Sequence, residues 1–154
     1  MPQAPISKIR FFFSESKPSL QNRKSLKSFI NSIFKKEKKI LGSINFIFTN
    51  DKIVRKINKE YLGHDFNTDV ITFDLSEKNG PISSDIYIST DRVRENARNL
   101  KLSYKSELHR VIFHGALHLC GYGDKVGKEV LKMRKMEEKY LNKYFRVSRD
   151  TVSV

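Results

Sequence analysis

Two histidines one helical turn apart are the residues of this chain best suited to chemistry. His114 and His118 stand at positions i and i+4 of an apolar segment, and a helix places such a pair on one face. Gly121 predicts a left-handed turn that ends this helix, after which Asp124 can direct its carboxylate toward the histidines. Two histidines and a carboxylate form catalytic zinc sites whose fourth position holds water. We therefore predict a metal site at His114, His118 and Asp124, where zinc would lower the pKa of that water toward neutrality.

The histidine pair also has a plainer interpretation. Helical histidines usually pack in a core or face solvent, and pairs at this spacing arise by chance. One metal motif is disfavoured, because Gly115 stands where the H-E-x-x-H motif of metalloproteases has its glutamate base. His109 lies about 140° around the helix from His114, so it is not expected to reach the metal. Cys120 is expected to be a small buried hydrophobe.

The elements that must position these residues can be predicted from apolar periodicity. Strands are expected at residues 9–13, 44–48, 70–73 and 85–89. Helices are expected to open at Pro18-Ser19, Asn50, Thr90, Ser103 and Gly127, with the last two running to Leu119 and Tyr144. An apolar stripe marks the first helix, at Leu26, Phe29, Ile30, Ile33 and Phe34. This order predicts a single α+β domain over residues 1–154, with helices packed on a small sheet.

Composition and charge narrow the class of protein. The chain has 154 residues, which is the size of one domain. A formal net charge of +13 favours binding to nucleic acid, although a coding sequence biased toward A and T would also enrich lysine. No apolar run approaches the ~20 residues of a membrane span, and no signal peptide is recognisable. The single cysteine fits a reducing cytosol, so we expect a cytoplasmic protein that binds no membrane.

Four blocks of the sequence carry more information than the histidine spacing. Residues 114–122 read HGALHLCGY and residues 58–73 read NKEYLGHDFNTDVITF. The other two are the strand at 85–88 and a set spaced by four residues, Met133, Glu137 and Leu141. These blocks resemble, in order, the signatures H-G-x-L-H-L-x-G-Y-D-H, N-x-x-Y-R-x-x-D-x-x-T-D-V-L-S-F, G-D-I-x-I and M-x-x-x-E-x-x-x-L of the YbeY family. The chain is therefore identified as a member of this family of metal-dependent endoribonucleases that mature rRNA.

The resemblance implies a fold and a site. It implies a zincin-like α+β fold with a small mixed sheet, one zinc ion per chain, and action on rRNA with the small ribosomal subunit or its assembly factors. His114 and His118 match the first two ligands of the family. Asp124 matches the third only by position, because the family has histidine there, and Gly123 replaces the family's aspartate. A carboxylate still suits zinc, so Asp124 remains the expected third ligand.

A further departure concerns the phosphate. The arginine of the family's Y-R pair, which the resemblance connects with catalysis or phosphate binding, is Leu62 here, and a hydrocarbon side chain binds no phosphate. We take His64 and Lys59 as candidate catalytic residues, and Arg55 and Lys59 as candidate RNA-binding residues. The plainer interpretation of His64 is a solvated loop histidine. Asp69 is expected to cap or hydrogen-bond its own loop rather than to act as a base.

These observations predict a single-strand-specific, metal-dependent endoribonuclease, acting in rRNA maturation and in ribosome assembly or quality control. Basic side chains would hold the phosphate backbone of single-stranded RNA, and no DNA substrate is expected. One alternative is a non-catalytic RNA-binding assembly factor, in which the metal is structural or the site has decayed. Another is a metallohydrolase of a different class, such as a peptidase, which Gly115 and the positive charge disfavour.

Overall fold

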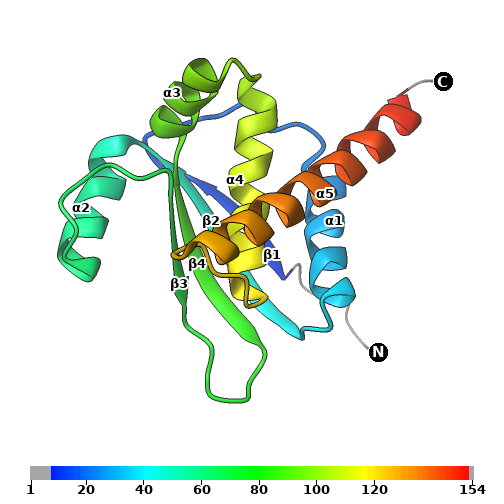
Figure 1. Ribbon diagram of the computed structural model, residues 1–154, viewed down its shortest axis with the longest axis horizontal. Helices are drawn as coiled ribbons and strands as arrows, with labels where there is room; N and C mark the ends of the chain where they lie inside the picture. The colour runs from blue at the N-terminus through cyan, green and yellow to red at the C-terminus, as the bar shows by residue number, and fades with distance from the viewer. Residues whose placement is uncertain (1–7, 153–154) are drawn as a thin grey trace, which may run out of the picture.

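A four-stranded mixed sheet in the order β1-β2-β4-β3 forms the base of the structure, a computed structural model that describes residues 8–152. Its strands are β1 (Ile9–Phe13), β2 (Leu41–Thr49), β3 (Val70–Asp74) and β4 (Ile82–Ser89). The first two run parallel to β4, and β3 is antiparallel to β4 at the edge of the sheet (Figure 1). The chain start, where no signal peptide is expected, lies outside the described residues.

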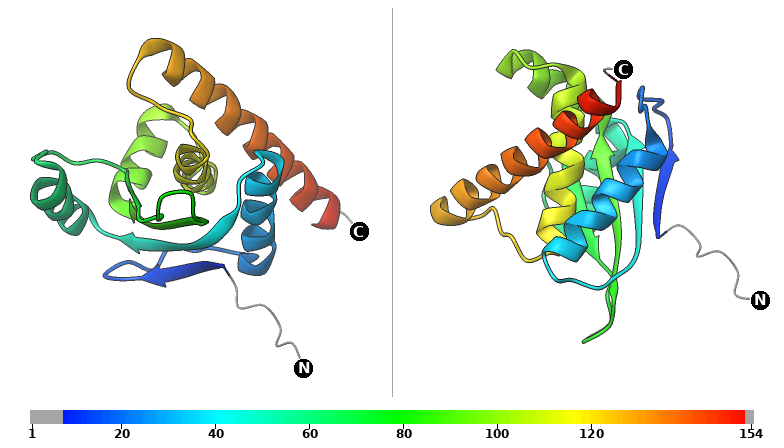
Figure 2. Two further views of the ribbon diagram at one scale, coloured as in Figure 1. Left: turned by 90° about the horizontal axis from the view of Figure 1, so that it is seen from below. Right: turned by 90° about the vertical axis from the view of Figure 1, so that its right-hand side faces the viewer.

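Five helices accompany the sheet in the described part of the chain. They are α1 (Arg23–Lys36), α2 (Asp51–Leu62), α3 (Thr90–Leu100), α4 (Tyr104–Leu119) and α5 (Gly127–Val152). Figure 2 shows α4 between the sheet and α5, so that the predicted histidine helix is enclosed on two sides. The expected α+β class and order of elements are confirmed. Within residues 8–152, no helix is long and apolar enough to cross a membrane.

The core forms where strand alternation meets the apolar faces of the helices. Ile44, Phe46 and Phe48 alternate along β2 and are fully buried, as are Ile86 and Ile88 on β4. Each such side chain contributes roughly 1.5–3 kcal/mol when it is removed from water. The predicted stripe on α1 also faces this core: Leu26, Ile30, Ile33 and Phe34 are buried, while Phe29 packs against it partly exposed. The apolar periodicity therefore identified the buried faces correctly.

Two predicted helix starts are wrong, one because of local backbone geometry and the other because of a hydrogen bond to a distant residue. The first helix begins at Arg23 rather than at Pro18-Ser19, because Asn22 has a φ of 53°, outside the right-handed helical region. At α3 the N-cap is Ser89 and not Thr90: the Ser89 hydroxyl accepts the N–H of Arg92 at 3.1 Å. The Thr90 hydroxyl instead donates to the Thr49 carbonyl.

Other predicted boundaries agree more closely with the structure. Asn50 caps α2 by accepting the N–H of Ile53 at 2.9 Å, as its side chain predicts. Ser103 caps α4 in the same way. The last helix starts at Gly127 as expected but continues past Tyr144 to Val152.

Candidate metal centre

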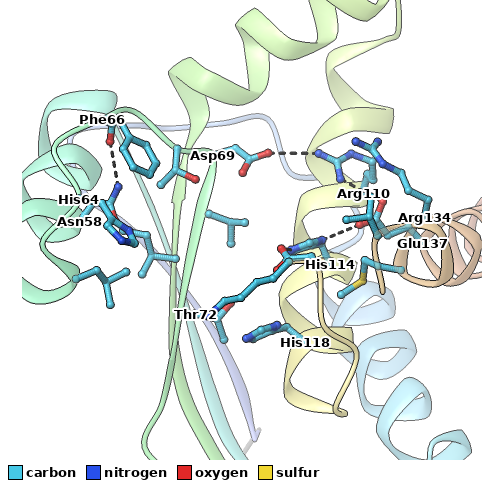
Figure 3. A pocket seen from close by; sticks show the side chains of 18 residues that line it. Asn58, His64, Phe66, Asp69, Thr72, Arg110, His114, His118, Arg134 and Glu137 are labelled. Carbon is cyan, nitrogen blue, oxygen red and sulfur yellow. Dashed lines mark hydrogen bonds and ion pairs between the residues drawn. The ribbon is translucent and has the colours of Figure 1, made fainter. Parts of the chain in front are cut away.

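One close contact between α4 and the sheet determines which way the two histidines face. A Cβ atom on Gly115 would lie 3.0 Å from Ile86 Cδ1, so α4 packs tightly against β4 at this glycine. A glutamate here would project against the sheet, which explains why the H-E-x-x-H arrangement does not fit this chain. His114 and His118 instead line an open pocket of about 520 Å³ between α4, α5, β3 and the loop after α2 (Figure 3).

His114 has a carboxylate at each ring nitrogen. Its Nδ1 lies 2.7 Å from Glu137 Oε2, and its Nε2 lies 3.2 Å from Asp124 Oδ2. A neutral imidazole donates a hydrogen bond from only one nitrogen. With Glu137 at Nδ1, the Nε2 atom and the Asp124 carboxylate oxygen lie close enough together for both to bind one cation. Glu137, which is 3% exposed, takes the Nδ1 side and leaves Nε2 directed at the pocket.

His118 is oriented by the turn that follows α4. Its Nδ1 lies 3.2 Å from the carbonyl oxygen of Tyr122, which leaves Nε2 free for a ligand. Gly121, with a φ of 106°, reverses the chain as predicted, and the Tyr122 hydroxyl donates to Glu37 at the end of α1. Histidines that bind metals almost always donate their other N–H to a carboxylate or a carbonyl oxygen. Both His114 and His118 have such a partner.

The predicted ligand set is only partly assembled. Asp124 meets His114, and His118 lines the same pocket, but among the side chains described, those of residues 8–146, no three His, Cys, Asp or Glu groups already surround a common point. The chemistry of the three side chains fits a divalent metal, because two imidazole nitrogens and one carboxylate oxygen are available. The three-ligand site therefore stays a prediction.

A buried arginine holds Glu137 in place behind His114. Arg110 donates to both oxygens of Glu107 at 2.8 Å, to Glu137 at 3.2 Å and to Asp69 at 3.3 Å. Burial alone would lower the pKa of Arg110, but hydrogen bonds and the three carboxylates raise it above its ordinary value. For Glu137, an acid, burial alone would raise the pKa. The hydrogen bond from His114 and the charge of Arg110 outweigh this effect, so the pKa of Glu137 is lowered.

This cluster gives the wall behind His114 an acidic character in an otherwise basic protein. Three carboxylates, those of Glu107, Asp69 and Glu137, surround the single guanidinium of Arg110. Asp124 adds another carboxylate on the other side of His114. An excess of negative charge at partly dehydrated side chains attracts a cation strongly, because the local dielectric is low.

The predicted catalytic and RNA-binding residues lie at different distances from the pocket. His64 lines it, as does Leu62, the residue that replaces the family's arginine. Lys59 and Arg55 lie on α2 and are not among the lining residues. Arg55 is engaged by Asp65 at 3.0 Å on the exposed surface. The structure thus brings His64, but neither of the two basic residues, into the pocket that the histidine pair lines.

No role was predicted from the sequence for four residues of the site. Arg110 and Glu137 support His114, and Lys125 and Arg134 bring positive charge to the pocket. Arg110 stands four residues before His114, on the same helical stripe, and that spacing could have revealed it. Glu137 was noted in a family signature without a role. Lys125 and Arg134 line the pocket, and neither side chain forms an ion pair with another residue in the described part of the chain. Lys125 directly follows Asp124 in the sequence, whereas only tertiary packing brings Arg134 of α5 to the pocket.

Asp69, His109 and Cys120 are the remaining polar candidates, and none of them is a proposed metal ligand. Asp69 was expected to hydrogen-bond its own loop, and that expectation is wrong. Its carboxylate instead accepts hydrogen bonds from Arg110 on α4 and Asn96 on α3. His109 is buried away from the pocket as predicted, with Nδ1 at 2.7 Å from the Lys105 carbonyl, and burial lowers its pKa. Cys120 is a buried thiol, as expected; burial, with the nearby Glu37 charge, raises its pKa to about 12.

Known proteins resemble this chain over most of its length. The family model described as "Endoribonuclease YbeY" matches residues 12–145. Endoribonuclease YbeY of Cytophaga hutchinsonii is 44% identical over 87% of this chain and 94% of its own length. The Porphyromonas gingivalis protein of the same name is 42% identical over 88% and 89%. The solution structure of TM1509 from Thermotoga maritima superposes with a TM-score of 0.64, at 33% identity over 93% of both chains. The resemblance of the sequence blocks is confirmed, and the chain belongs to the endoribonuclease YbeY family.

Proposed function

We propose that this protein is a metal-dependent endoribonuclease that cuts single-stranded RNA in the pocket beside His114. The observation that carries the proposal is that His114 Nε2 lies 3.2 Å from the Asp124 carboxylate in a pocket that His118 also lines. The family name states the same class of activity. The net charge of +13 favours a polyanionic substrate.

The proposed cofactor is one zinc ion per chain, held by His114, His118 and Asp124. When bound, zinc supplies positive charge that polarises a phosphoryl oxygen of the RNA. The protein prepares this site: Glu137 fixes the tautomer of His114, the Tyr122 carbonyl orients His118, and Arg110 holds Glu137.

The phosphate backbone would be held by cations on the pocket walls. Lys125 and Arg134 both line the pocket and are exposed, so their charges are available to a phosphodiester. An arginine can contact two phosphate oxygens at once. His64 remains our candidate to move a proton, because its imidazole lines the same pocket. Arg55 and Lys59 would contact RNA only where the chain runs outside the pocket, along α2.

The biological setting is proposed on the resemblance and on charge. We propose that the substrate is rRNA, that the small ribosomal subunit or its assembly factors are partners, and that the protein acts in the cytoplasm without DNA or a membrane. An alternative is a non-catalytic RNA-binding assembly factor. Leu62 in the pocket wall, in place of the family's arginine, is the observation that favours this alternative.

Metal content measured together with RNA cleavage tests the proposed function. We expect about one zinc per purified chain by elemental analysis, and cleavage of unstructured RNA that stops on chelation and returns with zinc. His114→Ala should lose both metal and cleavage while its circular dichroism is unchanged. Lys135→Ala, an exposed change on α5, serves as the control. RNA binding without cleavage in the zinc-loaded parent would establish the assembly factor, and cleavage that survives chelation would refute the metal site.

A further inference from the structure

An exposed aromatic ring occupies the wall of the pocket opposite the histidines. Phe66 lines the pocket and is 54% exposed. Its ring lies against the imidazole of His64, with centroids 5.3 Å apart and planes inclined by 16°. Figure 3 shows this pair on the α2 side, across from His114 and His118 on α4. The two rings form a small aromatic stack that no core residue covers.

The loop that carries this stack is held by a buried asparagine. Asn58, only 2% exposed, donates its side-chain amide to the Phe66 carbonyl at 3.1 Å, and its backbone carbonyl accepts the N–H of His64 at 3.2 Å. Asp65, between the two rings in sequence, pairs with Arg55 on the outer surface. The loop backbone is therefore ordered without burying the ring of Phe66. Ligands bind more tightly to such a prearranged surface, because less conformational entropy is lost.

We propose that Phe66 and His64 form a stacking site for one unpaired nucleobase of the RNA. The inference rests on the proposed function and specifies how that pocket selects its substrate. Every nucleobase has a flat face that stacks on an aromatic ring, and proteins that bind single strands use such rings with nearby cations. Here the cations are Lys125 and Arg134 of the same pocket. A base within a duplex is covered by its neighbours, so only single-stranded RNA can enter this stack.

The absence of tryptophan from the sequence allows a direct binding assay. Phe66→Trp introduces a single indole, whose fluorescence is quenched when a base stacks on it. We expect saturable quenching by a single-stranded 2′-O-methyl oligonucleotide, checked on a gel to be uncut. Phe12→Trp is the matched control, because Phe12 on β1 is 47% exposed and does not line the pocket.

Two further ligands separate stacking from attraction to the backbone. A duplex of the same sequence and an abasic strand of the same length carry phosphates but offer no free base, so neither should quench Phe66→Trp appreciably. Equal quenching by the abasic strand, or equal responses of Phe66→Trp and Phe12→Trp, would overturn the proposal.

Binding affinity gives an independent measure of the same contact. Phe66→Ala should weaken oligonucleotide binding by roughly 5- to 150-fold, the range for loss of one base–aromatic stack. Phe66→Leu keeps an apolar side chain without a ring and should lose nearly as much, while Phe66→Tyr should bind like the parent. Full binding by Phe66→Leu would instead indicate a general apolar contact and refute stacking.

Failure of this inference can be distinguished from failure of the proposed function. Zinc content should be unchanged in the Phe66 variants, because the partners of this residue are the His64 ring and the Asn58 amide, and neither belongs to a proposed zinc ligand. If the parent cleaves RNA and Phe66→Trp is not quenched, only the stacking site is refuted. If the parent does not cleave RNA but quenching is specific for free bases, the nuclease assignment fails and the base-binding site stands.

Discussion

Exchange of Glu137 for glutamine is the sharpest test of how the protein prepares its metal site. The two oxygens of Glu137 serve different donors, His114 Nδ1 at 2.7 Å and Arg110 at 3.2 Å. A glutamine has one oxygen and one NH2 group, so it can satisfy only one of them. With its oxygen toward His114, the NH2 group meets the Arg110 guanidinium, donor against donor.

The opposite orientation of the introduced glutamine harms the metal site directly. With the amide oxygen toward Arg110, the NH2 group faces His114 Nδ1, which must then accept a hydrogen bond. A neutral imidazole in that state carries its proton on Nε2, the nitrogen proposed to bind zinc. Both orientations are therefore unfavourable. The orientation that gives Arg110 its acceptor puts a proton on His114 Nε2, the nitrogen whose lone pair would bind zinc.

The size of the effect follows from the loss of this one supporting contact. Removal of a residue that orients a metal ligand usually costs 10–100-fold in metal affinity, about 1.4–2.7 kcal/mol. One buried donor is also left without an acceptor, which should lower the free energy of unfolding by roughly 1–3 kcal/mol. Zinc affinity would be measured by competition with a chelator of known affinity at pH 7.5, and stability by urea unfolding.

The neighbouring residue provides the control for this exchange. Glu138 is exposed, and within the described part of the chain its carboxylate has no hydrogen-bond or ion-pair partner. Glu138→Gln removes the same charge from the same helix but should leave zinc affinity unchanged. A Glu137→Gln variant that binds zinc as tightly as the Glu138→Gln variant would refute the proposed role of Glu137 in orienting His114.

Three further predictions concern single residues. Asp124→Ala should lose most of its zinc by elemental analysis and Asp124→His should retain it; tight binding by the alanine variant would show that Asp124 is no ligand. His64→Ala should slow RNA cleavage at unchanged zinc content, and unchanged cleavage would end its catalytic candidacy. Burial lowers the pKa of His109 below its ordinary 6.5. Below pH 6.5 the unfolded chain therefore binds a proton at His109 more readily than the folded protein does. The free energy of unfolding should fall there as the pH decreases, by up to about 1.4 kcal/mol per pH unit. Urea unfolding of parent and His109→Phe between pH 7.5 and 5.5 checks this, since the variant should lose that part of the slope; equal slopes would contradict it.

Much of the fold could be predicted because it depends on short-range patterns. The stripe from Leu26 to Phe34 repeats every three or four residues, and Asn50 and Ser103 cap helices through side chains that bond within three residues. The two wrong starts depended on more distant or unusual conditions. Thr90 donates to Thr49, 41 residues away, and the left-handed φ of Asn22 has no strong signal in the sequence.

For the site, too, the residues that could be predicted are close together in the sequence, and those that could not are distant. The spacing of His114 and His118, the turn at Gly121 and the position of Asp124 were sufficient to propose a metal site, since all lie within 11 consecutive residues. The partners that prepare it come from elsewhere. Glu137 stands 23 residues beyond His114, and Asp69 stands 41 residues before Arg110.

The sequence by itself therefore determined the class of fold, the family and the candidate ligands, because periodicity, helix caps and a contiguous motif are local properties of the chain. Only the tertiary structure decided which carboxylate supports His114, that Leu62 and Phe66 line the same pocket as the two histidines, and that Arg134 brings positive charge to that pocket. The physical reason is that α5 packs over α4 while the loop after α2 approaches from the other side. No spacing along the chain encodes that meeting of three distant segments.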